Sequence, residues 1–322
     1  MSVVAKNYSH YPVMLNEVIS SLNIKKNGIY VDGTYGTGNY SNAILNAGAS
    51  HLIAIDQDPA AEKTSINTKK KYGSTFSFIG GNFKNLKDIL ENMSISHVDG
   101  IVVDLGVSSP QLDQAERGFS FNKNGPLDMR MSQEGKSAKD IINTMPEKDL
   151  ADIFWKYGEE KKSYKIAHSI EKARNTEKIT STIQLANIIK NTFSARELST
   201  MKIHPATRCF QAIRIYVNNE LDSLESLLSQ SVDLLNDQGR LVVVTFHSLE
   251  DRIVKKFIKK QSGNEPSTMP KDLQKNIITL KEISRKPILA SREELSENPR
   301  SRSAKLRVAQ RIINKKNLQR KI

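Results

Sequence analysis

The first hundred residues alternate short apolar runs with amphipathic stretches of helical length, and this rhythm restricts the fold more than any other feature. The apolar runs cover residues 28–32, 51–56, 76–79 and 98–104. After the first two runs, helices are predicted over about 39–47 and 60–71. Strands separated by helices in this way predict βαβ units with right-handed crossovers. The fold class is therefore α/β, built on a parallel sheet.

The alternation breaks after Asp104. Residues 107–135 are rich in Gly, Pro, Ser and Asn, which predicts an ordered loop. The pattern from 137 to 196 is helical throughout, and 206–235 fits either one long helix or two. A long helical region therefore interrupts the strands.

Strand patterns return in the last third of the chain. A fifth strand is predicted at 239–246, with a helix after it at 249–260. Residues 276–283 and 304–313 are candidates for two last, partly antiparallel strands. The sheet is thus expected to resume after the helical region.

The predicted organisation is one α/β domain that hosts a helical insertion. The core comprises residues 1–112 and 206–322, and the insertion comprises residues 113–205. Ligands bind at the carboxyl edge of open α/β sheets, so an insertion placed after a strand's end lies beside that edge. The insertion is therefore predicted to help recognise the substrate.

The net charge of +13 is concentrated near the C-terminus. From Arg252 onward the chain holds 20 Lys and Arg against 6 Asp and Glu. Such asymmetry favours a polyanionic partner, of which nucleic acid is the commonest. A solubilising basic tail is the alternative. An acidic membrane surface is a weaker one, because no clean amphipathic stripe accompanies the charge.

Cysteine and histidine usage narrows the class further. The lone Cys209 excludes a disulfide framework and a cysteine-rich zinc site. The six histidines lack metal-ligand spacing, so no metal site is expected. Residues 1–10 lack the apolar core of a signal peptide, and no apolar run reaches the roughly 18 residues of a membrane span. A soluble cytoplasmic protein is predicted.

A glycine-rich loop, residues 31–38, follows the first predicted strand. Glycines allow the backbone to approach a ligand closely. The arrangement of Asp32, Gly33, Gly36 and Gly38 is neither the dinucleotide fingerprint nor a P-loop. A leading carboxylate would repel a pyrophosphate but suits a cationic ligand such as S-adenosylmethionine (SAM). A purely structural turn is the alternative.

Three further residues stand at the ends of predicted strands. Asp56 can accept both hydroxyls of a ribose, whereas Asp58 is assigned to a helix start because Pro59 follows it. Phe83 can flank an adenine ring, or it can belong to the core. Asp104 ends the fourth strand, where the methyl group and its acceptor should meet. Together these positions predict a methyltransferase.

Several long motifs resemble, in the same order, those of the bacterial 16S ribosomal RNA cytosine-N4 methyltransferase (RsmH, or MraW) family. They are the cofactor loop and residues 10–15, 104–130, 157–160, 204–221, 245–252 and 297–303. The resemblance covers nearly the whole chain. It implies a Rossmann-like class I methyltransferase core with an inserted all-helical domain. It also implies SAM-dependent methylation of a cytidine N4 in the decoding region of 16S rRNA, at the P site of the small ribosomal subunit.

The resemblance further implies the residues that bind the cofactor. They are Gly38, Asn39, Tyr40, Asp56, Phe83, Asp104 and Gln111. One departure concerns the loop, because the family usually has Gly-Gly-His where this chain has Gly38-Asn39-Tyr40. Contacts made by the backbone are expected to survive this change. Contacts that need a histidine ring or the second glycine are not.

Two residues are candidates for the chemistry. Cytosine's exocyclic amine is a poor nucleophile, because its lone pair is delocalised, so an acceptor for one N–H is needed. Asp104, or a nearby backbone carbonyl, is that candidate, since the Pro-Pro-aromatic motif of many amino-methyltransferases is missing here. His247 follows the fifth strand and could take a proton or contact RNA. A structural hydrogen bond is the alternative for His247.

Other side chains are candidates for RNA contacts. Phe246 could stack on a displaced base, or it could close the core. Arg117, Arg130, Arg208 and Arg214 are candidates for phosphate contacts, or they could pair with local carboxylates.

Three classes of function stay open. The first is an rRNA N-methyltransferase, the second a methyltransferase for another nucleic-acid or protein acceptor, and the third a non-catalytic ribosome assembly factor. Retention of Asp32, Asp56 and Asp104 argues against the third. The sequence does not choose between free 16S rRNA and the assembled small subunit, or between a monomer and a homodimer.

Overall fold

The computed structural model describes residues 12–264 and 278–313. The chain divides into two compact units, Met1–Gly106 with Asp222–Ile322, and Val107–Leu221. The helical insertion predicted at 113–205 lies within the second unit. Residues 10 and 11 of the N-terminal motif, the start of the strand predicted at 276–283, and the tail from Asn314 lie outside the described residues.

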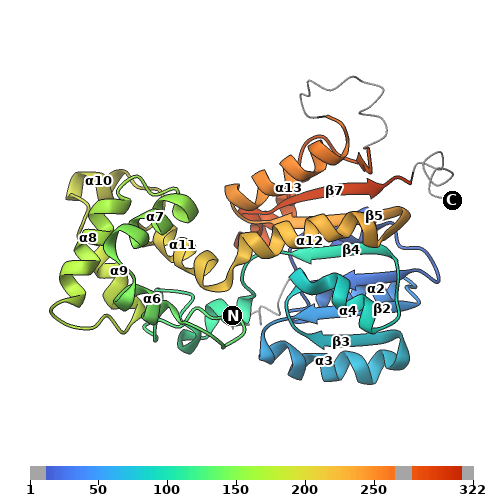
Figure 1. The fold of residues 1–322 in the computed structure, drawn as a ribbon, viewed down its shortest axis with the longest axis horizontal. Coiled ribbons are helices and arrows are strands. Elements are labelled where there is room, and N and C mark those ends of the chain that lie inside the picture. The colour runs from blue at the N-terminus through green and yellow to red at the C-terminus, as the bar shows by residue number, and fades with distance from the viewer. Residues whose placement is uncertain (1–11, 265–277, 314–322) are drawn as a thin grey trace, which may run out of the picture. The chain divides into compact units, whose positions relative to one another are not determined.

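The first unit is built on a seven-stranded sheet of order β3-β2-β1-β4-β5-β7-β6 (Figure 1). Strands β1 to β5 pair in parallel, and β7 runs antiparallel to both β5 and β6. The predicted parallel sheet with a partly antiparallel end is therefore confirmed. The strands are β1 (Ile29–Asp32), β2 (His51–Asp56), β3 (Phe76–Gly80), β4 (Val98–Asp104), β5 (Leu235–Thr245), β6 (Leu280–Glu282) and β7 (Lys305–Arg311).

Helices pack on both faces of this sheet because successive strand residues point to opposite sides. Tyr30 and Val102 belong to a core shared with α1, α2 and α3, whereas Val31, Ile101 and Val103 belong to a core shared with α4, α12 and α13. The helices are α1 (Leu15–Leu22), α2 (Asn39–Asn46), α3 (Pro59–Tyr72), α4 (Leu86–Asn92), α12 (Glu220–Leu234), α13 (Ser248–Gln261) and α15 (Arg292–Glu297). Short 3₁₀ turns are η1 (Gly73–Thr75), η2 (Phe83–Asn85) and η4 (Pro299–Ser303).

The helices predicted at 39–47, 60–71 and 249–260 are confirmed as α2, α3 and α13. The sequence pattern did not single out α1, α4 or α15. Helices of six to eight residues repeat their apolar face too few times to give a clear period, and α2, which is equally short, was predicted where a glycine-rich turn precedes it.

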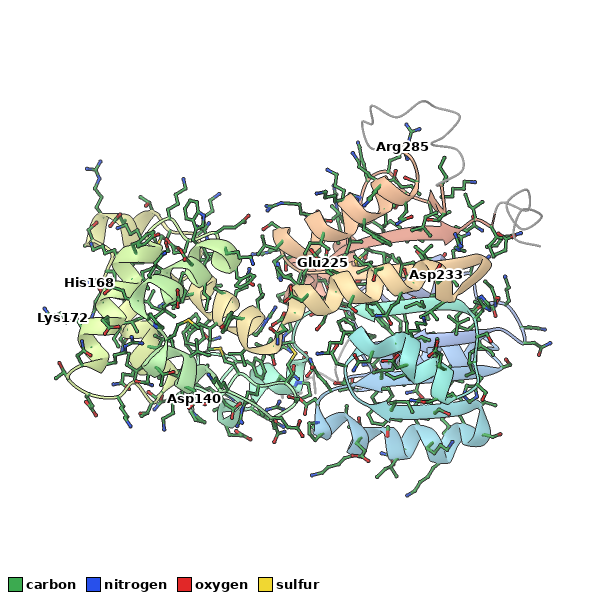
Figure 2. All side chains as sticks on the ribbon, in the orientation of Figure 1. Asp140, His168, Lys172, Glu225, Asp233 and Arg285 are labelled. Carbon is green, nitrogen blue, oxygen red and sulfur yellow. The ribbon has the colours of Figure 1, made fainter. Side chains whose placement is uncertain are left out.

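The second unit is helical, as predicted. Asp140, His168 and Lys172 are among the polar side chains of this unit that are exposed (Figure 2). Leu150, Phe154 and others form one buried core. The elements are α5 (Ser109–Asp113), η3 (Ala115–Arg117), α6 (Ala138–Thr144), α7 (Glu147–Gly158), α8 (Ser163–Arg174), α9 (Thr182–Lys190), α10 (Ala195–Thr200) and α11 (Ala206–Asn218).

Helix α11 belongs to the second unit, whereas the sequence analysis placed residues from 206 onward in the sheet domain. The reason is packing against α7. Cys209 and Ile213 are buried in the helical core, and a Cβ on Gly158 would lie 2.8 Å from the Arg208 carbonyl oxygen. Asn219, at φ 49°, ends α11, so the stretch predicted as one helix or two is two.

No helix in the described ranges combines the length and apolar character that a membrane crossing requires.

Candidate functional site

The strand order reverses between β1 and β4, which is where ligands bind in open α/β sheets. Asp32 ends β1, and Asp104 ends the adjacent β4. Hydrogen bonds tie the loops after these strands together. The Gly33 N–H donates to the Val102 carbonyl at 2.8 Å, and the Asp104 N–H donates to Thr34 Oγ1 at 2.7 Å. The sequence-predicted cofactor loop is therefore held against the end of β4.

At two glycines of this loop, a side chain would collide with neighbouring atoms. Gly38 has φ 81°, and a Cβ there would lie 2.6 Å from the Tyr35 hydroxyl oxygen. A Cβ on Gly33 would lie 2.7 Å from Val103 Cγ1. The backbone thus turns tightly into α2 at positions that only glycine fits without displacing its neighbours.

The N-terminus of α2 has no side-chain cap. Gly38 is its N-cap residue, and the side-chain amide of Asn39 donates from Nδ2 to Thr37 Oγ1 at 2.9 Å. Backbone N–H groups in the first turn of a helix attract anions. This end of α2, with Asn39 and Tyr40, fits the carboxylate of an amino-acid ligand.

Asp32 is fully buried beside this helix end. It accepts a hydrogen bond from Ser41 Oγ at 2.7 Å and one from the Thr34 N–H at 3.2 Å. Burial raises the pKa of Asp32 to about 6, although both hydrogen bonds act to lower it, and the charge of Asp56 raises it further. An ionised Asp32 would therefore be stabilised by a cation.

Asp104 is the least satisfied carboxylate of the site. Its Oδ1 atom is buried and has no hydrogen-bond partner among the described residues. Burial is the main reason that the pKa of Asp104 is raised well above its ordinary value. Three further carboxylates add to this shift, namely those of Asp32, Glu250 and Glu294. A buried acceptor surrounded by negative charge calls for a cation or a hydrogen-bond donor.

Asp56 lies at the end of β2 and accepts hydrogen bonds from backbone N–H groups through both of its carboxylate oxygens. Its Oδ2 accepts from the Gly36 N–H at 2.7 Å, and its Oδ1 accepts from the Asp58 N–H at 2.9 Å. Burial raises the pKa of Asp56. Asp58 caps α3 by accepting from the Ala60 N–H at 3.0 Å, which confirms its predicted place at a helix start.

Phe83 begins η2 after β3 and is partly buried against the core that contains Val103. The side chain of the preceding Asn82 stabilises this turn through two hydrogen bonds. Its Oδ1 accepts from the Lys84 N–H, and its Nδ2 donates to Gln57 Oε1, both at 2.9 Å.

His247 is the N-cap residue of α13. Its Nδ1 accepts from the Glu250 N–H at 3.4 Å, while Glu250 Oε2 accepts from the Phe246 N–H at 2.7 Å. Its Nε2 lies 2.9 Å from Glu250 Oε1, but the ring N–H is not aligned with that oxygen. The ring therefore has a structural role, and its predicted catalytic role stays a prediction. Phe246 packs partly buried against the core, which fits the alternative given for it.

Gln111 belongs to the second unit. Its side chain forms a capping box at the start of α5, where Oε1 accepts from the Ser108 N–H at 2.9 Å.

The four candidate arginines, also in the second unit, have local partners. Arg130 makes a two-pronged pair with Asp128, and Arg214 makes one with Glu220, both with contacts at 2.8 Å. Arg117 is buried and donates to two backbone carbonyls. Arg208, whose side chain is 50% exposed, remains the phosphate candidate whose charge is most accessible.

The sequence analysis assigned no role to Glu250 or Glu294, and both are buried near Asp104. Glu250 stands three residues after His247 in a capping-box spacing, so a search for helix starts could have found it. No local pattern marks Glu294 as buried.

Comparisons with known proteins show which family and which relatives this chain is similar to. The sequence model described as the MraW methylase family matches residues 7–312. The chain is 46% identical over 308 residues to ribosomal RNA small subunit methyltransferase H of Maricaulis maris, covering 93% of this chain and 90% of the relative. It is 47% identical over 310 residues to the protein of that name from Hydrogenovibrio crunogenus, covering 94% and 97%. A solved rRNA methylase from Streptococcus thermophilus aligns over 93% of this chain and 94% of its own at 10% identity, with a TM-score of 0.40.

Proposed function

Since this chain belongs to the MraW methylase family, we propose that it transfers a methyl group from SAM to the exocyclic N4 of a specific cytidine in 16S rRNA. The proposed position is in the decoding region, at the P site of the small ribosomal subunit. The observation that carries the proposal is the buried Asp104 Oδ1, which lacks a partner among the described residues and lies at the switch point of the sheet.

The residues present fit SAM. We propose that Gly38, Asn39 and Tyr40 hold its amino-acid end at the start of α2, and that Asp56 binds the ribose hydroxyls. Phe83 would lie against the adenine ring, and Gln111 is carried over from the resemblance alone. When bound, SAM supplies an electrophilic methyl group on a sulfonium. Its positive charge matches the negative charge of Asp32 and Asp104.

Asp104 is the proposed acceptor for one N–H of the cytosine amine. Accepting that hydrogen bond localises the nitrogen lone pair and orients the amine for an in-line displacement, for which orientation supplies much of the acceleration. The raised pKa of Asp104 makes its carboxylate a stronger proton acceptor than an ordinary aspartate. His247 is proposed to position Phe246 and Glu250 beside it through the cap of α13.

Helix α13 is the proposed contact surface for rRNA phosphates within the first unit. After its first turn it carries five basic and no acidic residues, and four of them are exposed: Arg252, Lys255, Lys256 and Lys260. Phosphate contacts of this kind position a nucleic acid without reading its sequence. A ribosomal substrate also supports the cytoplasmic location predicted from the sequence.

The test is methyl transfer from tritiated SAM to naked 16S rRNA, isolated small subunits and DNA, with mass spectrometry of the cytidines. We expect N4-methylcytidine at one rRNA position. Asp104→Asn should lower the turnover by about a hundredfold or more, the lower range for loss of a positioned acid–base group.

Label in DNA alone would contradict the proposed acceptor, and label nowhere would favour an assembly factor. Full turnover by Asp104→Asn with intact SAM binding would contradict the role of Asp104.

A further inference from the structure

Two motifs from opposite ends of the described chain meet at one buried carboxylate, that of Glu294 on α15. The Met14 N–H donates to Glu294 Oε1 at 2.8 Å, and the Ser301 hydroxyl donates to the same oxygen. Only 7% of Glu294 is exposed. Ser291 caps the start of α15 by accepting from the Glu294 N–H at 3.1 Å, which fixes the backbone from which this side chain projects.

The peptide group between Val13 and Met14 is held from both sides. Glu294 accepts its N–H, and the Tyr40 hydroxyl donates to its carbonyl, that of Val13. Met14 has φ 51°, a left-handed conformation that non-glycine residues adopt rarely. Two side-chain hydrogen bonds thus stabilise a backbone bend that would otherwise be unfavourable.

Tyr40 links this peptide group to the cofactor loop. It is the second residue of α2, directly after Gly38 and Asn39, and only 5% of it is exposed. Burial is the main cause of the raised pKa of its phenol, and the charges of Asp104, Asp32 and Glu294 add to it, so the four groups lie in the same region. In this chain Tyr40 replaces the histidine usual in the family, and its hydroxyl is the group that reaches Val13.

We propose that Glu294 is a positioning residue for the cofactor site. By holding the Val13–Met14 peptide group, it holds the Tyr40 ring and the first turn of α2 in the conformation that receives the amino-acid end of SAM. This proposal rests on the proposed function. The amino-acid end is the same in SAM and in the product S-adenosylhomocysteine, so both ligands should sense the arrangement equally. An effect of the Glu294 charge would instead change the affinity for the cationic SAM alone.

The experiment measures the dissociation constants of SAM and S-adenosylhomocysteine by calorimetry, together with thermal unfolding. Glu294→Ala and Tyr40→Phe should each weaken both ligands by about tenfold, the loss expected for one hydrogen bond. The double variant should lose little more than either single one, because both changes release the same peptide group. Glu294→Gln should stay within about twofold for S-adenosylhomocysteine, since an amide oxygen still accepts from Met14 and Ser301.

The matched control is Glu293→Ala, which removes an exposed glutamate from the adjacent position of α15. It should leave both affinities unchanged. Folded Glu294→Ala and Tyr40→Phe proteins that bind both ligands as the wild type does, whatever their melting temperatures, would overturn the proposal. So would a loss for SAM only. If Glu294→Ala does not fold, the affinities of Tyr40→Phe and Glu294→Gln for the two ligands are the test of the proposal.

Failure of the proposed function is distinguishable from failure of this proposal. A wild-type protein that binds SAM but methylates no rRNA would contradict the proposed function, while the binding constants would still test Glu294. Where methylation is observed, Glu294→Ala should raise the KM for SAM by about tenfold and leave kcat nearly unchanged. This is the expected result when binding of the ground state and of the transition state is weakened equally.

Discussion

Asp32 and Asp104 end adjacent strands, and their carboxylates are buried. Among the described residues, no basic side chain contributes to the pKa shift of either group. Burying an unpaired carboxylate costs free energy, so burial shifts each group toward its protonated form in the free protein. A bound sulfonium would act in the opposite direction. The same two residues that destabilise the ligand-free site are therefore suited to bind a cationic cofactor.

Stability should follow pH in the direction set by Asp32. Its pKa is about 6 in the folded protein against an ordinary value of 3.8. The stability that this group contributes is fully present below pH 3.8 and is lost as the pH rises through about 6. Urea unfolding between pH 4 and 7 should therefore show a larger loss of stability in the ligand-free wild type than in Asp32→Asn. Parallel pH profiles of the two proteins would contradict this assignment, and saturating SAM should reduce the wild-type loss.

Gly38→Ala tests the loop against another glycine of positive φ that has open surroundings. Gly73 has φ 60° with no atom within 4 Å of its Cβ position, whereas a Cβ on Gly38 would meet the Tyr35 hydroxyl. Gly73→Ala should cost about 1–3 kcal/mol of stability, because its ψ of −127° lies outside the left-handed region, and should leave SAM binding unchanged. Gly38→Ala should also destabilise the protein and should weaken SAM binding by at least about tenfold. Equal effects of the two variants on SAM affinity would argue against a ligand-binding role for this turn.

At the scale of elements, two helix starts at the carboxyl edge of the sheet differ in their caps. Helix α13 begins with a capping box in which His247 and Glu250 satisfy each other's backbone groups. Helix α2 begins at Gly38 without a side-chain cap. A capped end has its N–H groups satisfied, whereas an uncapped end keeps them for a ligand. We therefore expect α2 to bind the cofactor and α13 to support the acceptor side.

Substitution of His247 separates its capping role from a catalytic one. His247→Ala removes the acceptor for the Glu250 N–H and should lower the free energy of unfolding by about 1 kcal/mol. His247→Asn should restore most of that stability, because asparagine is a favourable cap. Denaturant unfolding and kcat are measured on both variants. An asparagine variant with normal stability but a kcat reduced by about a hundredfold or more would show that the ring acts in catalysis.

At the scale of the whole molecule, basic helices lie at both edges of the sheet of the first unit. Helix α3 packs on β3 at one edge, and α13 packs on β6 and β7 at the other (Figure 1). Each helix carries exposed lysines, with Glu62 in the first turn of α3 and Glu250 and Asp251 in that of α13, but α13 is followed in sequence by the basic C-terminal part of the chain. The α13 edge is therefore the expected side for rRNA.

Removing three charges from each edge tests this expectation. The variant Lys255→Gln, Lys256→Gln, Lys260→Gln should reduce the salt dependence of rRNA binding, with a slope smaller by about two, since each lost phosphate contact removes roughly 0.7. The matched control is Lys63→Gln, Lys70→Gln, Lys71→Gln, on exposed positions of α3. Filter binding across a salt series measures both. Equal slopes for the two variants would mean that the charge acts without a localised contact.

The sequence by itself determined the features that depend on neighbouring residues. Periodicity predicted the parallel sheet and the helices α2, α3 and α13, and the glycines after β1 marked the turn before Asn39. These features could be predicted because local backbone preferences depend on neighbouring residues in the sequence. Only the tertiary structure decided which distant residues share a site. Glu294 meets Met14 and approaches Asp104 because β7 pairs antiparallel with β5, so that the segment before β7, which contains α15, lies at the carboxyl edge of the sheet. His247 turned out to cap α13, and α11 joined the helical unit, because burial and packing against α7 depend on the whole fold rather than on spacing along the chain.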